Sequence, residues 1–137
     1  MRSVLALSDS QVRSFLGFDF GSRRVGVATG NTLTRTASPL TTIAAEGNAR
    51  IDSISALIEA WQPAALVVGV PFHPDGAAHV NTGRARRFAG QLRARFRLPV
   101  HEVDERYTTV EARARGASDL DAAAAALILQ QYLADAP

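Results

Sequence analysis

The chain of 137 residues contains no cysteine and no lysine. The absence of cysteine excludes disulfides, thiolate nucleophiles and sulfur-ligated metals, so any metal ion must be held by oxygen or imidazole. No apolar run approaches the roughly 20 residues of a membrane span. The apolar run near the N-terminus, VLAL, is too short for the core of a secretion signal. We therefore expect a cytoplasmic protein that does not enter a membrane.

All fifteen cationic residues are arginine, and they outnumber the carboxylates enough to give a net charge of +2. The guanidinium group is planar and can bind phosphate through two parallel hydrogen bonds, so the bias is typical of a protein that contacts nucleic acid. High-GC coding would enrich arginine and alanine in the same way. Only the positions of the arginines can distinguish these two explanations.

Apolar residues make up 47% of the chain and charged residues 20%, which is enough apolar surface for one hydrophobic core. A chain of this length forms one compact domain. We predict a single domain over residues 1–137, with an N-terminal extension at 1–13 and a core at about 14–133.

Five segments have the pattern of β-strands. The runs at 14–19 and 24–29 flank a turn with a glycine and predict a hairpin. A third strand is predicted at 36–43. The run at 64–70 is apolar throughout and bounded by prolines, which is typical of a strand buried on both faces. The last strand is predicted at 98–103.

Helical patterns separate and follow the later strands. Apolar residues recur at helical spacing over 49–61, and 82–96 predicts a basic amphipathic helix. Capping boxes at 108–111 and 118–121 each predict the start of a helix, the second of which continues to about Leu133. The order βββαβαβαα predicts an α/β fold with a mixed five-stranded sheet, an antiparallel meander plus parallel strands, flanked by helices.

Three carboxylates stand where this fold could bring them together. Asp19 ends the first strand among apolar neighbours, Glu105 follows the last strand, and Asp121 begins the apolar final helix. Converging carboxylates form a site for a hard cation, Mg²⁺ or Mn²⁺. Two such ions would activate a water and stabilise the leaving oxygen of a phosphodiester.

Each acid also has an ordinary structural interpretation. Asp19 could accept backbone hydrogen bonds in a turn, and Glu105 could be a surface residue after a strand. Asp121 could be the acidic member of a capping box.

Four motifs, taken together and in their order along the chain, favour the functional interpretation of the three acids over the structural one. They are DFGSRRVGVA, GVP followed by DG, VDERYTTVEAR and DAAAAALILQQYL. From Phe15 to Leu133 the chain resembles the YqgF family, described as Holliday junction resolvases or pre-16S rRNA nucleases with an RNase H-like fold. The family's three acidic positions are matched by Asp19, Glu105 and Asp121.

The resemblance implies a metal-dependent nuclease for structured nucleic acid, which most often matures the 5′ end of 16S rRNA. Its partner would be pre-rRNA or, as an alternative, branched DNA. The segment from Glu111 to Asp121 is shorter than in the family. This could remove substrate contacts or shift Asp121.

Several cationic or hydroxyl side chains could contact phosphate. They lie on the predicted hairpin turn, directly after Glu105, and on the basic helix. The candidates are Ser22, Arg23, Arg24, Arg106, Arg84, Arg87 and Arg95.

Two other functions compete with the nuclease hypothesis. The Asp-x-Gly of the first hairpin also resembles the phosphate hairpin of actin-like ATPases, but those enzymes close two such domains around ATP. A non-catalytic RNase H-like module that binds nucleic acid or protein is the second alternative. A symmetric junction resolvase would need a homodimer, whereas trimming one RNA end needs only a monomer.

Overall fold

The computed structural model describes residues 12–73, 75–78, 80–105 and 120–135. Five strands form one sheet in the order β3-β2-β1-β4-β5. β1 pairs antiparallel with β2, and β2 with β3, whereas β1, β4 and β5 run parallel. The strands are β1 (Ser14–Phe20), β2 (Val25–Asn31), β3 (Ala37–Ile43), β4 (Ala65–Val70) and β5 (Val100–Asp104). The predicted mixed five-stranded sheet is confirmed.

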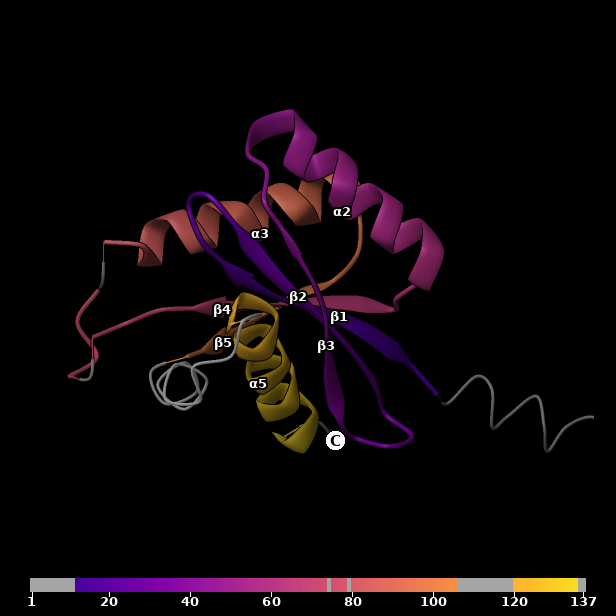
Figure 1. Cartoon of the computed structure of the whole chain (residues 1–137). Helices are drawn as coiled ribbons and strands as arrows, with labels where there is room; N and C mark the ends of the chain where they lie inside the picture. Colours follow the sequence, from indigo (N-terminus) through magenta and orange to yellow (C-terminus); the bar gives the residue numbers. More distant parts are fainter. Residues whose placement is uncertain (1–11, 74, 79, 106–119, 136–137) are drawn as a thin grey trace, which may run out of the picture.

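Helices cover both faces of this sheet (Figure 1). One face packs against α2 (Gly47–Trp61) and α3 (Thr82–Phe96), and the other against α5 (Leu120–Asp135). Because side chains of a strand alternate between faces, β1 contributes to both cores. Leu16 and Phe18 are buried on the side of α2 and α3, and Phe15 on the side of α5.

The observed element boundaries differ from the predicted ones by one to a few residues. The basic helix is confirmed at 82–96, while the last strand begins at Val100 instead of residue 98. Pro99 cannot donate a hydrogen bond, although its carbonyl accepts one from Leu66. The predicted helix after 108–111 and the capping box at 118–121 lie outside the described residues, except that α5 is helical from Leu120 onward.

The ends of α2 follow from local chemistry. Gln62 adopts the left-handed conformation after the last turn and donates its backbone N–H to Ile58. Pro63 follows it and cannot continue the helix. Over the residues that the structure describes, no helix is both long and apolar enough to cross a membrane.

Candidate metal and nucleic-acid site

Asp19 lies on β1 between two glycines of the neighbouring strands. It is paired with Gly26 of β2 and with Gly69 of β4. Phe15 packs in the core beside α5, and a Cβ at Gly17 would contact Leu129 of α5. Strand alternation therefore puts the Asp19 side chain on the same face as α5. The two glycines leave space on both sides of the Asp19 carboxylate.

The first turn of α5 fills the space above Gly26. A Cβ at Gly26 would overlap the backbone carbonyl of Asp121. The absence of a side chain at this position thus allows α5 to approach the sheet directly. Because Gly26 is the cross-strand partner of Asp19, Asp121 is brought next to Asp19.

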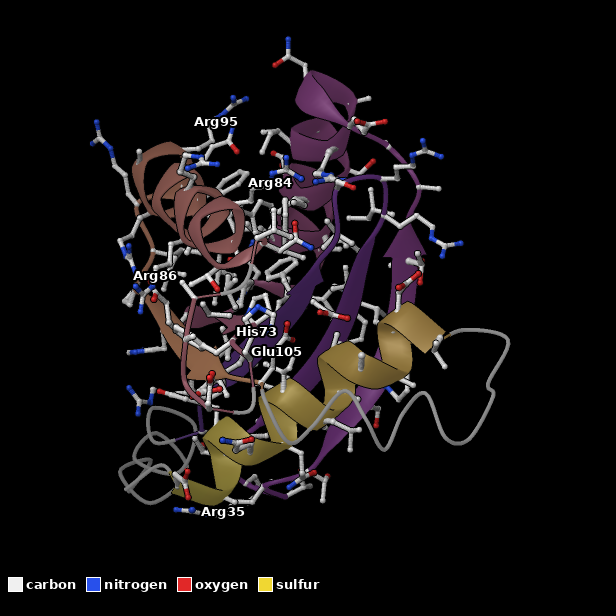
Figure 2. All side chains as sticks on the ribbon, turned by 90° about the vertical axis from the view of Figure 1, so that its left-hand side faces the viewer. Arg35, His73, Arg84, Arg86, Arg95 and Glu105 are labelled. Atoms are coloured by element: carbon white, nitrogen blue, oxygen red, sulfur yellow. The ribbon has the colours of Figure 1, made fainter. Side chains whose placement is uncertain are left out.

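Glu105 fills the space above Gly69, on the other side of Asp19. Its backbone N–H donates to Val70 at 3.2 Å, and only 5% of the residue is exposed. A Cβ at Gly69 would lie 2.7 Å from Glu105 Oε2. Since β1 and β4 are neighbours about 4.8 Å apart, the carboxylates of Asp19 and Glu105 share one small region. Figure 2 shows Glu105 just above the ribbon of α5.

The Asp121 carboxylate is engaged by an arginine. Arg24 Nε lies 3.1 Å from Asp121 Oδ2, with 64% and 31% of the two side chains exposed. Across the described ranges, no three His, Asp or Glu side chains stand as a ready group for a metal ion. Asp19, Glu105 and Asp121 therefore come from neighbouring parts of the backbone, but their side chains do not stand together as a metal-binding group in this structure, and Arg24 pairs with Asp121.

The residue types at this position suit a divalent cation of the magnesium class. Three carboxylates offer oxygen ligands, and the Oε2 atom of Glu105 is shielded from solvent. For a metal ion to bind all three acids, the Asp121 carboxylate would have to release Arg24 and bind the metal in its place. The ion pair between Arg24 and Asp121 is partly exposed, so it stabilises the structure by only about 0.2–1 kcal/mol. The free energy needed to break it is therefore small.

A buried arginine that the sequence analysis did not single out holds the hairpin turn next to Asp19. Arg50 of α2 is 7% exposed. Its Nη2 donates to the carbonyl of Ser22 at 3.2 Å, and its Nε donates to the carbonyl of Ala45 at 2.8 Å. Burial lowers the pKa of Arg50, and the charge of Glu46 partly opposes this effect. The signal in the sequence is that Arg50 falls on the apolar stripe of α2.

The candidate phosphate ligands divide into three groups. Ser22, Arg23 and Arg24 are exposed on the turn beside Asp19. Arg84 and Arg87 line a pocket between α3 and α2, and Figure 2 shows Arg84 in the space between these helices. Arg95 lies near the far end of α3, with its guanidinium 6.0 Å from the ring centre of Phe96. Arg106 lies outside the described residues.

Neighbouring arginines of α3 have other partners. Arg86 pairs with Glu102 at 3.2 Å and lies over the ring of Phe72. Arg93 donates to the carbonyl of Val100 at 2.8 Å. These arginines connect α3 to the edge of the sheet.

Comparison with known proteins identifies close relatives. The family model "RuvX: Holliday junction resolvase" matches residues 13–135. A protein of Polaromonas sp. is 63% identical over 126 residues, covering 92% of this chain and 91% of the relative. A protein of Albidiferax ferrireducens is 64% identical over 124 residues, covering 90% and 80%. Both carry the name "Putative pre-16S rRNA nuclease".

Solved structures with a similar fold include a RuvC. Thermus thermophilus RuvC in complex with a Holliday junction substrate has a TM-score of 0.53 and 18% identity, covering 88% of this chain and 93% of that one. At this identity the similarity shows the fold alone, the RNase H-like fold. The family itself follows from the sequence relatives and from a model that spans almost all of the chain. This chain belongs to the RuvX (YqgF) family.

Proposed function

We propose that this chain is a nuclease that hydrolyses phosphodiester bonds in structured nucleic acid and processes the 5′ end of pre-16S rRNA. The observation that carries this proposal is the placement of Asp19 between Gly26 and Gly69, which brings Asp121 and Glu105 to its two sides. These are the three acids that match the family's acidic positions. The names of the relatives support the reaction and the RNA substrate.

In this proposal Asp19, Glu105 and Asp121 hold Mg²⁺ or Mn²⁺ through carboxylate oxygens. A divalent cation bound there would activate water and stabilise the leaving oxygen. The burial of Glu105 limits the number of conformations its carboxylate can adopt, so this ligand is held in place before binding. The exposed turn residues Ser22 and Arg23 would position the phosphate of the substrate.

Arg24 has a second role in this scheme. When Asp121 binds a cation, the Arg24 guanidinium is released and becomes available to a substrate phosphate beside the site. The remaining proposed phosphate contacts come from α3 and from the residue after Glu105. They are Arg84, Arg87, Arg95 and Arg106.

Removing Arg24 is expected to strengthen metal binding. In Arg24→Gln, Mn²⁺ no longer competes with a guanidinium for Asp121, so its Kd should fall about two- to fivefold, the equivalent of a partly exposed ion pair. Titration of Mn²⁺ followed by electron paramagnetic resonance measures this directly and needs no substrate. The matched control is Arg23→Gln, which removes an equal charge from the same turn. An equal change of the Mn²⁺ Kd in both variants would show that only the overall electrostatic potential of the turn had changed. It would contradict the exchange of Arg24 for the metal at Asp121.

The proposed function is tested by giving one preparation two substrates. They are an RNA that carries the 5′ extension of 16S rRNA and a four-way DNA junction, each with Mn²⁺ and with a chelator as the control. We expect metal-dependent cleavage of the RNA with the junction left intact. Paired symmetric cuts in the junction would instead support the resolvase that the family description names and would require a homodimer.

A third outcome would overturn the nuclease proposal. Binding of either substrate without cleavage in the presence of metal would support a non-catalytic binding module. A monomer is sufficient for trimming one RNA end, so the proposed reaction does not require a dimer. We propose that the protein acts in the cytoplasm.

A further inference from the structure

A pocket of about 350 Å³ lies between α2 and α3, on the face of the sheet opposite α5. Phe20 of β1 forms one wall. The start of α2 and the N-terminal part of α3 form the others. The lining residues from the helices are Gly47, Arg50, Ile51, Arg84, Arg87, Phe88 and Gln91.

The charge of this pocket is of one sign. Three lining residues are arginines and none is acidic. In the part of the chain that the structure describes, Arg84 and Arg87 form no salt bridge, since the ion pairs there involve Arg24, Arg86 and Arg93. The neighbouring carboxylate is Glu46, which precedes α2 and acts on Arg50. A cavity with this lining attracts an anion.

Arg50 is held in a fixed position at the pocket. Two backbone carbonyls accept its hydrogen bonds, and its guanidinium lies 5.5 Å from the ring centre of Phe20. Burying a cation is costly unless an opposite charge accompanies it. An anion between Arg50 and the two arginines of α3 would offset this cost. The planar guanidinium is well suited to phosphate oxygens.

We propose that the pocket between α2 and α3 binds a phosphate group through Arg50, Arg84 and Arg87. The pocket and the candidate cleavage site lie on opposite faces of the sheet at the same end of β1, since Phe20 directly follows Asp19 and Arg50 holds the turn at Ser22. The phosphate comes from a nucleic-acid strand that passes over this turn, or it is free in solution. For a strand phosphate this inference rests on the proposed function, which already places Arg84 and Arg87 among the phosphate contacts, but binding in the pocket requires neither metal nor cleavage.

Backbone amide signals in a ¹⁵N NMR titration test the site on the full chain. The titration is run at low salt with a chelator present, using inorganic phosphate in one arm and a ten-nucleotide single-stranded RNA in the other. We expect shifts at residues 47–51 and 84–91. Shifts with inorganic phosphate assign a site for free phosphate, and shifts with RNA alone assign a strand phosphate. No shift at these residues with either probe would overturn the proposal.

Two single substitutions, one in α3 and one at the residue that directly follows this helix, separate a local site from general electrostatic attraction. Arg87→Gln removes one lining arginine, and Arg97→Gln removes the same charge about 15 Å further along the helix. We expect the RNA affinity to fall about five- to tenfold in Arg87→Gln and less than about twofold in Arg97→Gln. The slope of log K against log salt should decrease by about 0.7 in Arg87→Gln only.

The outcome that contradicts a local site is an equal loss in both variants. Thermal unfolding of both proteins confirms that the fold is retained, since both side chains are exposed. The double variant Arg84→Gln/Arg87→Gln should abolish the NMR shifts at residues 47–51, which neither substitution alters directly. Persistent shifts there would also overturn the proposed contacts. Cleavage by the same variants is measured separately, so failure of the nuclease proposal would leave this test intact.

Discussion

Replacing Asp19 with asparagine is expected to reduce cleavage by at least about 10³-fold, or roughly 4 kcal/mol in the activation barrier. The side chain keeps its shape but loses its charge and one of its two oxygen ligands. Asp19 lies between the other two acids, so its removal affects the shared metal site more than loss of a peripheral contact would. Single-turnover cleavage of the RNA substrate with saturating Mn²⁺ measures the effect.

The same variant should remain folded and should still bind RNA. Asp19 is close to buried Glu105, and removing one of two like charges relieves repulsion between them. The matched control is Asp52→Asn on the exposed side of α2, which should cleave at the wild-type rate. Loss of the folded state in Asp19→Asn would instead assign Asp19 a structural role as a hydrogen-bonded turn residue.

A second large effect is expected when a methyl group is added at Gly26. The Cβ of Gly26→Ala would overlap the carbonyl of Asp121, which belongs to the backbone and cannot rotate away. The first turn of α5 must then move off the sheet, which weakens the packing of this helix on Phe15 and Ala28 of the sheet. We expect a loss of about 3 kcal/mol in the free energy of unfolding, which lowers the Tm by roughly 10 °C. Thermal and urea unfolding measure both quantities.

Gly90 of α3 provides the matched control for this substitution. A Cβ at Gly90 would meet no atom within 4 Å. Gly90→Ala should therefore stabilise the protein by about 0.5–1 kcal/mol, because alanine favours the helix more than glycine does. Cleavage should fall in Gly26→Ala, which displaces Asp121, and stay unchanged in Gly90→Ala. Equal stability of the two variants would contradict the close approach of α5 to β2.

The sequence by itself determined the fold class and the order of the elements. Alternating and continuous apolar runs predicted all five strands, and helical spacing predicted the basic helix at 82–96. These patterns are local, since they depend on which side of one strand or helix is buried. The motifs also selected Asp19, Glu105 and Asp121, because the resemblance depends on residue types in order along the chain.

The surroundings of those three acids were decided only by the tertiary structure. Gly26 and Gly69 flank Asp19 because of strand register, which joins residues up to fifty positions apart. The pairing of Arg24 with Asp121 joins a hairpin turn to the last helix, and this contact depends on how closely α5 packs on the sheet.

The arginines show the same division between local and tertiary information. Their number and the basic helix are visible in the sequence, but the sequence does not indicate which partner each of the fifteen arginines contacts. The folded chain turns Arg86 toward Glu102, buries Arg50 beneath the hairpin, and places Arg84 and Arg87 around a pocket. The physical reason is that charge and hydrogen bonding act over a few ångströms in space. Which groups come within that range is determined by the packing of helices on the sheet.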